Sequence, residues 1–187
     1  ADDLSGFTVS LSSDGTIVAI GSRKNDGTGT DAGHVRVYKY NGSAWTKLGD
    51  DIDGEAEDDL SSQSVSLSSD GTIVAIGAHY NDGTASNAGH VRIYQYNGSA
   101  WTKLGSDIDG EAGGDWSGWS VSLSSDGTTV AIGAFDNDGT ASGAGHVRVY
   151  NLVNQNAPVA SNVSAATVKN TNASIHLAAS DEDFDTL

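Results

Sequence analysis

Two short acidic segments are the strongest candidates for chemistry in this sequence. Asp51-Ile52-Asp53-Gly54-Glu55 places three carboxylates within five residues around a glycine turn, and the same five residues return as Asp107-Ile108-Asp109-Gly110-Glu111. Calcium prefers six to eight oxygen ligands, so each segment supplies part of a calcium site and backbone carbonyls or other loops must complete it. We therefore predict calcium binding at Asp51, Asp53, Glu55, Asp107, Asp109 and Glu111; the alternative is a solvated acidic face.

Three further groups of residues are candidate sites. The Asp-rich ending of the sequence predicts a second calcium site at Asp181, Asp183 and Asp185. Glycine-rich loops and one indole supply candidate ligand contacts at Asp26, Asp82, Asp138 and Trp116. Asn-x-Ser sequons make Asn41, Asn97, Asn162 and Asn172 possible glycosylation sites, which matter only in a glycosylating secretory route.

Catalysis finds little support in the residues. The many serines lie outside any G-x-S-x-G nucleophile elbow. His34, His90 and His146 occupy one repeat position next to a glycine, which favours a structural role. No pair of carboxylates stands in visibly opposed environments, as acid–base catalysis requires. We therefore expect that the chain is not an enzyme.

The elements that must position these residues are repeated. The stretch from Val9 to Gly21 returns at Val65 and again at Val121, 56 residues further on each time and without insertions. A fixed period of this length indicates a repeat architecture, in which each unit buries its apolar face on its neighbours. Three repeats are expected, over about 4–59, 60–115 and 116–152.

Each complete repeat reads as four antiparallel strands, and the third repeat is incomplete because Asn151-Leu152-Val153-Asn154 replaces its fourth-strand sequence. In the first repeat they are expected at 7–12, 16–21, 34–40 and 44–48, with period-two alternation or β-branched runs. Asp14-Gly15 and Asn41-Gly42 are tight-turn signals. Because alternate connections of a meander fall on opposite rims, the acidic connectors 49–61 and 105–117 should share one rim with the loops 22–33, 78–89 and 134–145. The fold class is predicted as all-β, with β-propeller-type blades.

The composition limits the classes of binding partner that we expect. Nine basic and 25 acidic residues give a net charge of −16, which disfavours nucleic acid and anionic membrane surfaces. The chain has no Cys and no Met, so neither a disulfide framework nor a Cys-ligated metal is available. No apolar run approaches the roughly 18 residues of a membrane span. We expect partners to be other protein chains, further blades of the same polypeptide or cell-surface glycans, with no nucleic acid and no membrane insertion.

Several segments resemble a known repeat family. Ser117-Gly118-Trp119-Ser120-Val121, Val130-Ala131-Ile132-Gly133-Ala134 and Gly145-His146-Val147-Arg148-Val149-Tyr150 resemble the FG-GAP repeat of integrin-α-like propellers, in the variant found in large secreted or cell-surface microbial proteins. The resemblance covers roughly 4–152. It implies a propeller used in adhesion or ligand binding, often supported by calcium. The calcium loop of that family lies between the first two strands, where this chain has only Ser-Ser-Asp-Gly-Thr, so that site is not carried over.

Residues 153–187 are expected to form a separate part. Ala157-Pro158-Val159 holds the only proline, a linker signal, and 163–168 and 173–179 read as strands. The acidic ending resembles the start of a cadherin-like or immunoglobulin-like adhesin module. Three blades do not close a ring comfortably, so we expect a fragment of a longer propeller or a subunit that assembles.

The leading functional hypothesis is a non-catalytic extracellular or cell-surface module for adhesion, ligand binding or assembly. A lectin-like propeller is the first alternative. The accessory propeller of a secreted hydrolase is the second.

Overall fold

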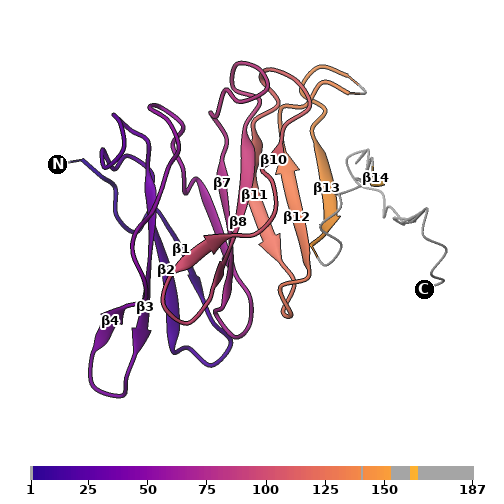
Figure 1. The fold of residues 1–187 in the computed structure, drawn as a ribbon. Coiled ribbons are helices and arrows are strands. Elements are labelled where there is room, and N and C mark those ends of the chain that lie inside the picture. Colours follow the sequence, from indigo (N-terminus) through magenta and orange to yellow (C-terminus); the bar gives the residue numbers. More distant parts are fainter. Residues whose placement is uncertain (1, 140, 153–160, 164–187) are drawn as a thin grey trace, which may run out of the picture.

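The computed structural model describes residues 2–139, 141–152 and 161–163, with no account of side chains in the last of these ranges. All regular structure in these residues is β-strand, arranged as three antiparallel sheets in chain order. Figure 1 shows the sheets one after another, from indigo at the N-terminal end to orange. No helix in the described part of the chain is long and apolar enough to span a membrane.

The first sheet, blade 1, follows the predicted meander. Its strands are β1 (Thr8–Leu11), β2 (Ile17–Ser22), β3 (His34–Tyr40) and β4 (Trp45–Lys47), hydrogen-bonded in that order. The turns form as their residues predict: the Asp14 carboxylate accepts the Thr16 N–H at 2.9 Å, and the Asn41 side chain accepts the N–H groups of Ser43 and Ala44 at 3.0 Å. Local turn chemistry therefore sets the strand ends on this rim.

Blades 2 and 3 repeat this order. Blade 2 holds β6 (Ser64–Leu67), β7 (Ile73–Ala78), β8 (His90–Tyr96) and β9 (Trp101–Lys103), and blade 3 holds β11 (Ser117–Leu123), β12 (Thr129–Ala134) and β13 (His146–Asn151). The all-β, propeller-type prediction is confirmed in these strands. In β11 the register shifts between Ser117 and Ser120, which makes room for the two residues Gly118 and Trp119 as a bulge.

The acidic connectors contain strands that the sequence did not predict. β5 (Ile52–Asp53) pairs with β3 beyond the end of β4, and β10 (Ile108–Asp109) pairs with β8 in the same way. The outer edges of blades 1 and 2 are thus each split into two short strands. In blade 3 the corresponding position is taken by β14 (Ser161–Val163), where Val163 lies opposite Val147 as Ile52 lies opposite Val35. Tail strands are expected at 163–168 and 173–179. Val163 is described, and the remaining residues of both strands lie outside the described residues.

The hydrophobic core lies between the blades. The first cluster joins Ile17, Val35 and Val37 of blade 1 to Val65 and Leu67 of blade 2. The second cluster joins Val91, Ile93 and Ile108 of blade 2 to Val130 and Ile132 of blade 3. Each blade therefore buries its apolar face on the next one, as stacked repeats must.

Candidate ligand-binding rim

One rim gathers the long loops and the acidic connectors. Gly33 forms a parallel bridge with Ser61, and Gly89 forms the same bridge with Ser117 one repeat later. Ser61 N donates to Ala32 O at 2.9 Å. Each loop between the second and third strands is therefore hydrogen-bonded to the connector that enters the next blade.

The first carboxylate of each acidic triplet is held by cations of its own blade. Asp51 accepts from Arg36 at 2.9 and 2.8 Å and from Lys47 at 2.7 Å. The Arg36 hydrogen bonds hold the pKa of Asp51 well below its usual range, against the opposing effect of burial, with Lys47 assisting. These charge-assisted bonds are the strong kind, so this carboxylate already has two cationic partners.

Asp107 repeats that arrangement in blade 2. It accepts from Arg92 at 3.0 and 2.9 Å and from Lys103 at 2.7 Å. Burial raises the pKa of Asp107, but the hydrogen bonds from Arg92 and Lys103 outweigh it and lower the pKa to about 2. Both triplets thus begin with a carboxylate that stays ionised.

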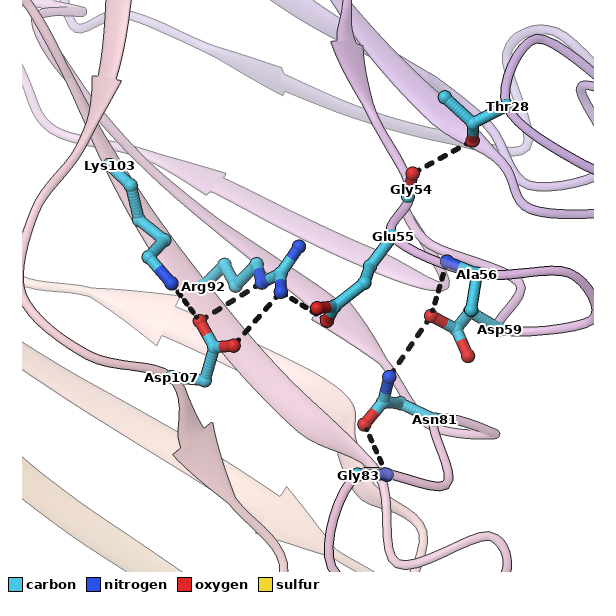
Figure 2. Close-up of polar contacts among 10 residues, drawn as sticks. All are labelled: Thr28, Gly54, Glu55, Ala56, Asp59, Asn81, Gly83, Arg92, Lys103 and Asp107. Carbon is cyan, nitrogen blue, oxygen red and sulfur yellow. Dashed lines mark hydrogen bonds and ion pairs between the residues drawn. The ribbon is translucent and has the colours of Figure 1, made fainter.

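The last carboxylate of each triplet reaches across to the following blade. Glu55 pairs with Arg92, so this arginine joins Glu55 of one blade to Asp107 of its own, as Figure 2 shows. Glu111 pairs with Arg148 in the same way. These two glutamates therefore link blades.

The middle carboxylates lie near buried histidines. His34 Nδ1 lies 3.8 Å from Asp51 Oδ2 and 3.9 Å from Asp53 Oδ1. Burial lowers the pKa of His34 and brings that of His90 down to about 4. Burial also raises the pKa of Asp109. The sequence predicts a structural role for these histidines. The structure nevertheless brings possible metal-ligand atoms together in two sets. One set is His34 with Asp51 and Asp53, and the other is His90 with Glu55 and Asp107.

The paired triplets do not fit a calcium ion as they stand. Calcium needs a shell of oxygen ligands. Both carboxylate oxygens of Asp51 are hydrogen-bonded to Arg36 or Lys47, and the Glu55 carboxylate pairs with Arg92. A bound divalent cation would have to displace these positive side chains. This pairing argues against the calcium binding predicted at Asp51 and Glu55, and a calcium titration tests that prediction. Asp181, Asp183 and Asp185 lie outside the described residues.

A buried Asp–Asn pair that we did not predict ties each connector to its neighbouring loop. Asp59 accepts from Asn81 Nδ2 at 3.0 Å and from Ala56 N at 3.1 Å, and Asn81 in turn accepts the Gly83 N–H at 2.9 Å (Figure 2). Burial raises the pKa of Asp59. The same pair recurs as Asp3 with Asn25 and Asp115 with Asn137, always 22 residues apart. The repeated spacing of 22 residues between Asp and Asn is the sequence signal from which this pair could have been predicted.

The predicted ligand aspartates shape their own loops. Asp26 accepts the Asp31 N–H at 2.9 Å, and Asp82 accepts the Asn87 N–H at 2.7 Å. Asp138 accepts the Gly143 N–H at 2.7 Å.

Trp116 belongs to an aromatic cluster at the junction of blades 2 and 3. Its ring stacks on Trp119 with centroids 5.8 Å apart and contacts Phe135 at 5.1 Å. His79 and Tyr80 of blade 2 complete the cluster.

The candidate sequons fall into two groups. Asn41 and Asn97 lie in the hairpin turns of the opposite rim, where their side chains bind backbone N–H groups. Asn162 lies within β14 and pairs in register with Arg148. Asn172 lies outside the described residues.

A groove of about 430 Å³ lies on the rim between blades 1 and 2. One wall is the connector of blade 1, and the other is the loop between β7 and β8. Its lining residues are Glu55, Ala56, Glu57, Asp58, Asp59, Tyr80, Asn81, Asp82, Gly83 and Asn87. The groove is strongly acidic, and its walls are held together by the Asp59–Asn81 and Glu55–Arg92 pairs described above.

Comparison with known proteins identifies the fold. No protein-family model matches the chain, and no curated protein matches its sequence. A Bacteroides uniformis protein named as a candidate 6-phosphogluconolactonase aligns with a TM-score of 0.54 and 12% identity, over 81% of this chain and 38% of its own. The β-propeller domain of Cps50 (Swd1) from Myceliophteria thermophila gives 0.50 and 12%, over 83% and 38%. The Pseudomonas aeruginosa periplasmic gluconolactonase PpgL gives 0.50 and 15%, over 77% and 38%.

The described chain is thus made of β-propeller-type blades and spans little more than a third of each of these structures. Identities this low establish the fold alone. The FG-GAP resemblance stays a prediction.

Our prediction that the chain is not an enzyme is wrong as an exclusion, because two of these neighbours of the same fold carry lactonase names. We drew it from the lack of a local catalytic motif. In folds of this kind functional residues come from loops on a shared scaffold, so a missing local motif does not exclude catalysis.

Proposed function

We propose that this chain is an extracellular adhesion module that binds a protein ligand on its acidic rim. The groove between blades 1 and 2 carries the proposal. It is the place where exposed carboxylates, among them Glu57 and Asp58, stand on a connector fixed by cross-blade contacts. Pre-organised loops on a rigid scaffold are the usual arrangement for binding.

The chemistry of the groove selects the ligand class. Carboxylates accept hydrogen bonds and attract cations, so the expected ligand presents lysine or arginine side chains. The net charge of −16 adds long-range attraction for such a partner. The extracellular placement rests on the FG-GAP-like motifs.

The test compares two variants of equal charge. Glu57→Gln/Asp58→Asn removes two carboxylates from the groove, and Asp2→Asn/Asp50→Asn removes two exposed carboxylates that do not line it. Binding of a fluorescent oligolysine peptide is measured by anisotropy. We expect the groove variant to weaken binding about fivefold, since each exposed ion pair contributes up to about 1 kcal/mol, and the control variant to weaken it much less.

Equal weakening by both variants would mean that net charge alone attracts the peptide and would overturn the proposal. Binding to a glycan array without binding to the peptide would replace the protein ligand by carbohydrate. In either case the melting temperature of each variant establishes that the fold is intact.

A further inference from the structure

The two ends of the blade stack expose apolar side chains, and two of them, Val9 and Val147, have buried repeat counterparts. On blade 1, Val9 is 62% exposed, whereas its counterpart Val65 is 8% exposed. On blade 3, Val147 is 49% exposed, whereas its counterpart Val91 is fully buried. We call the first end face the exposed side chains of Leu4, Phe7, Val9 and Leu11, and the last end face those of Phe135 and Val147.

These faces correspond to the two sides of the internal junctions. Val65 and Leu67 of blade 2 pack into the cluster that contains Val35 of blade 1. Val9 and Leu11 occupy the same repeat positions on blade 1, and Val147 occupies the position of Val35 on blade 3. In an internal junction, side chains at the positions of the first end face pack against side chains at the positions of the last end face. The two end faces are therefore matched to each other in the same way.

Hydrogen bonds across the internal junctions follow the same series. Leu67 N donates to Ser10 Oγ at 2.9 Å, and Leu123 N donates to Ser66 Oγ at 2.9 Å one repeat later. The next members of this series are Leu11 N on the first end face and Ser122 Oγ on blade 3. A blade 1 seated on blade 3 would bring this donor and this acceptor together.

Backbone shape at the last end face is also that of a junction. Gly33 and Gly89 have positive φ and pair with the backbone of the following blade at Ser61 and Ser117, where a Cβ would collide with the carbonyl oxygen. Gly145 keeps the same conformation, with φ of 67°. Within 4 Å of its Cβ position the nearest atoms belong to Phe135 of its own blade. The space beside Gly145 thus suits the backbone of residue 5 from an incoming blade 1.

We propose that the two end faces bind each other between copies of this chain, so that blade 1 of one copy packs on blade 3 of a second copy. The occupant is a second copy because the internal junctions place the repeat counterparts of these two surfaces against each other. Such contacts are head to tail and use different surfaces on the two partners. This proposal is independent of the acidic rim and its ligand.

One position departs from the series. Ile17 and Ile73 contact the turn glycine of the following blade, at Gly71 and Gly127. Blade 3 has Thr129 at this position, so Gly15 of a second copy would meet a smaller and more polar side chain. The contact between copies should therefore be weaker than an internal junction, and Thr129→Ile should strengthen it.

The test uses light scattering with one variant for each face. We expect the wild-type chain to exceed its monomer mass of 19.1 kDa as concentration rises. Val9→Asp and Val147→Asp should each remain monomeric alone. Their equimolar mixture should form a 1:1 dimer, because each variant keeps the face that the other lacks. Thr129→Ile should lower the dissociation constant several-fold.

Two outcomes would overturn the proposal. One is a wild-type chain that stays monomeric at all concentrations, which would leave the end faces to another partner. The other is a Val9→Asp or Val147→Asp variant that associates as the wild type does. Both aspartates replace exposed residues, and Thr102→Asp on β9 of the central blade serves as the matched control, which should associate normally.

Discussion

One repeat position carries different chemistry in each blade, and it determines the character of the junctions. Arg23 lies over the Phe7 ring at 3.9 Å and donates to Gln63 at 3.0 Å, so the junction between blades 1 and 2 is polar here. His79 instead packs edge-on against Trp119, with centroids 5.0 Å apart. Its Nδ1 is buried without a hydrogen-bond partner among the described residues.

His79 makes stability depend on pH. Burial lowers its folded-state pKa to about 4 from the usual 6.5. The unfolded state therefore binds more protons than the folded state between these values, and stability falls as pH drops from 6.5 towards 4. The repeat supplies the replacement, since blade 3 has Phe135 here. We expect His79→Phe to reduce this loss by about 2 kcal/mol, measured by urea unfolding at pH 7.5 and 4.5.

His90 remains in that variant, and its pKa is also lowered to about 4, so part of the slope should persist. An unchanged slope in His79→Phe would contradict the assignment. Similar stability of the two proteins at pH 7.5 is the control for packing.

At the scale of the strand, some features could be predicted and others could not. The turns at Asp14-Gly15 and Asn41-Gly42 depend on neighbours in sequence, and they form where expected. β5 and β10 have only two residues each, too few for a periodic signal, and they exist because Ile52 and Ile108 are drawn into the junction clusters.

The sequence predicts where the candidate rim lies but not how its side chains pair. Connectivity alone brings the loops and connectors to one side. The pairing of Glu55 with Arg92 depends on blade packing across 37 residues, which no local pattern reveals. Sequence therefore supplied the carboxylates but not their partners.

Trp101 on β9 forms a hydrogen bond between blade 2 and blade 1. Its Nε1 donates to Leu48 O at 2.7 Å, whereas its counterpart Trp45 is 46% exposed and contacts Tyr40 of its own blade. We expect Trp101→Phe to lower the free energy of unfolding by about 1 kcal/mol or more, and Trp45→Phe to change it by less than about 0.5 kcal/mol. Chemical denaturation measures both, and equal effects would show that the cross-blade bond contributes nothing.

At the scale of the whole molecule, the blades are joined mainly through apolar clusters and arginine–carboxylate pairs. Arg92 is only 14% exposed between its two carboxylates. Arginine and lysine side chains of the chain itself thus pair with part of the carboxylates in the acidic connectors at each junction.

Calcium should consequently leave the thermal stability unchanged. A ligand that binds only the folded state raises the melting temperature, and the stabilisation grows with the logarithm of the ligand concentration divided by its dissociation constant. Since Arg36, Lys47 and Arg92 already pair with Asp51, Glu55 and Asp107, we expect no rise in melting temperature at millimolar calcium. A clear rise that EDTA reverses would show that calcium binds despite this pairing.

Several hydrogen bonds that span a junction repeat with the sequence. Ser13 N donates to Ser69 O, and Ser69 N donates to Ser125 O, each at 2.8 Å. A gene that gains or loses one whole repeat therefore encodes a chain whose new junction keeps these repeated backbone contacts. Duplication and deletion of complete units can change the length of this protein in evolution while the backbone part of each junction is preserved.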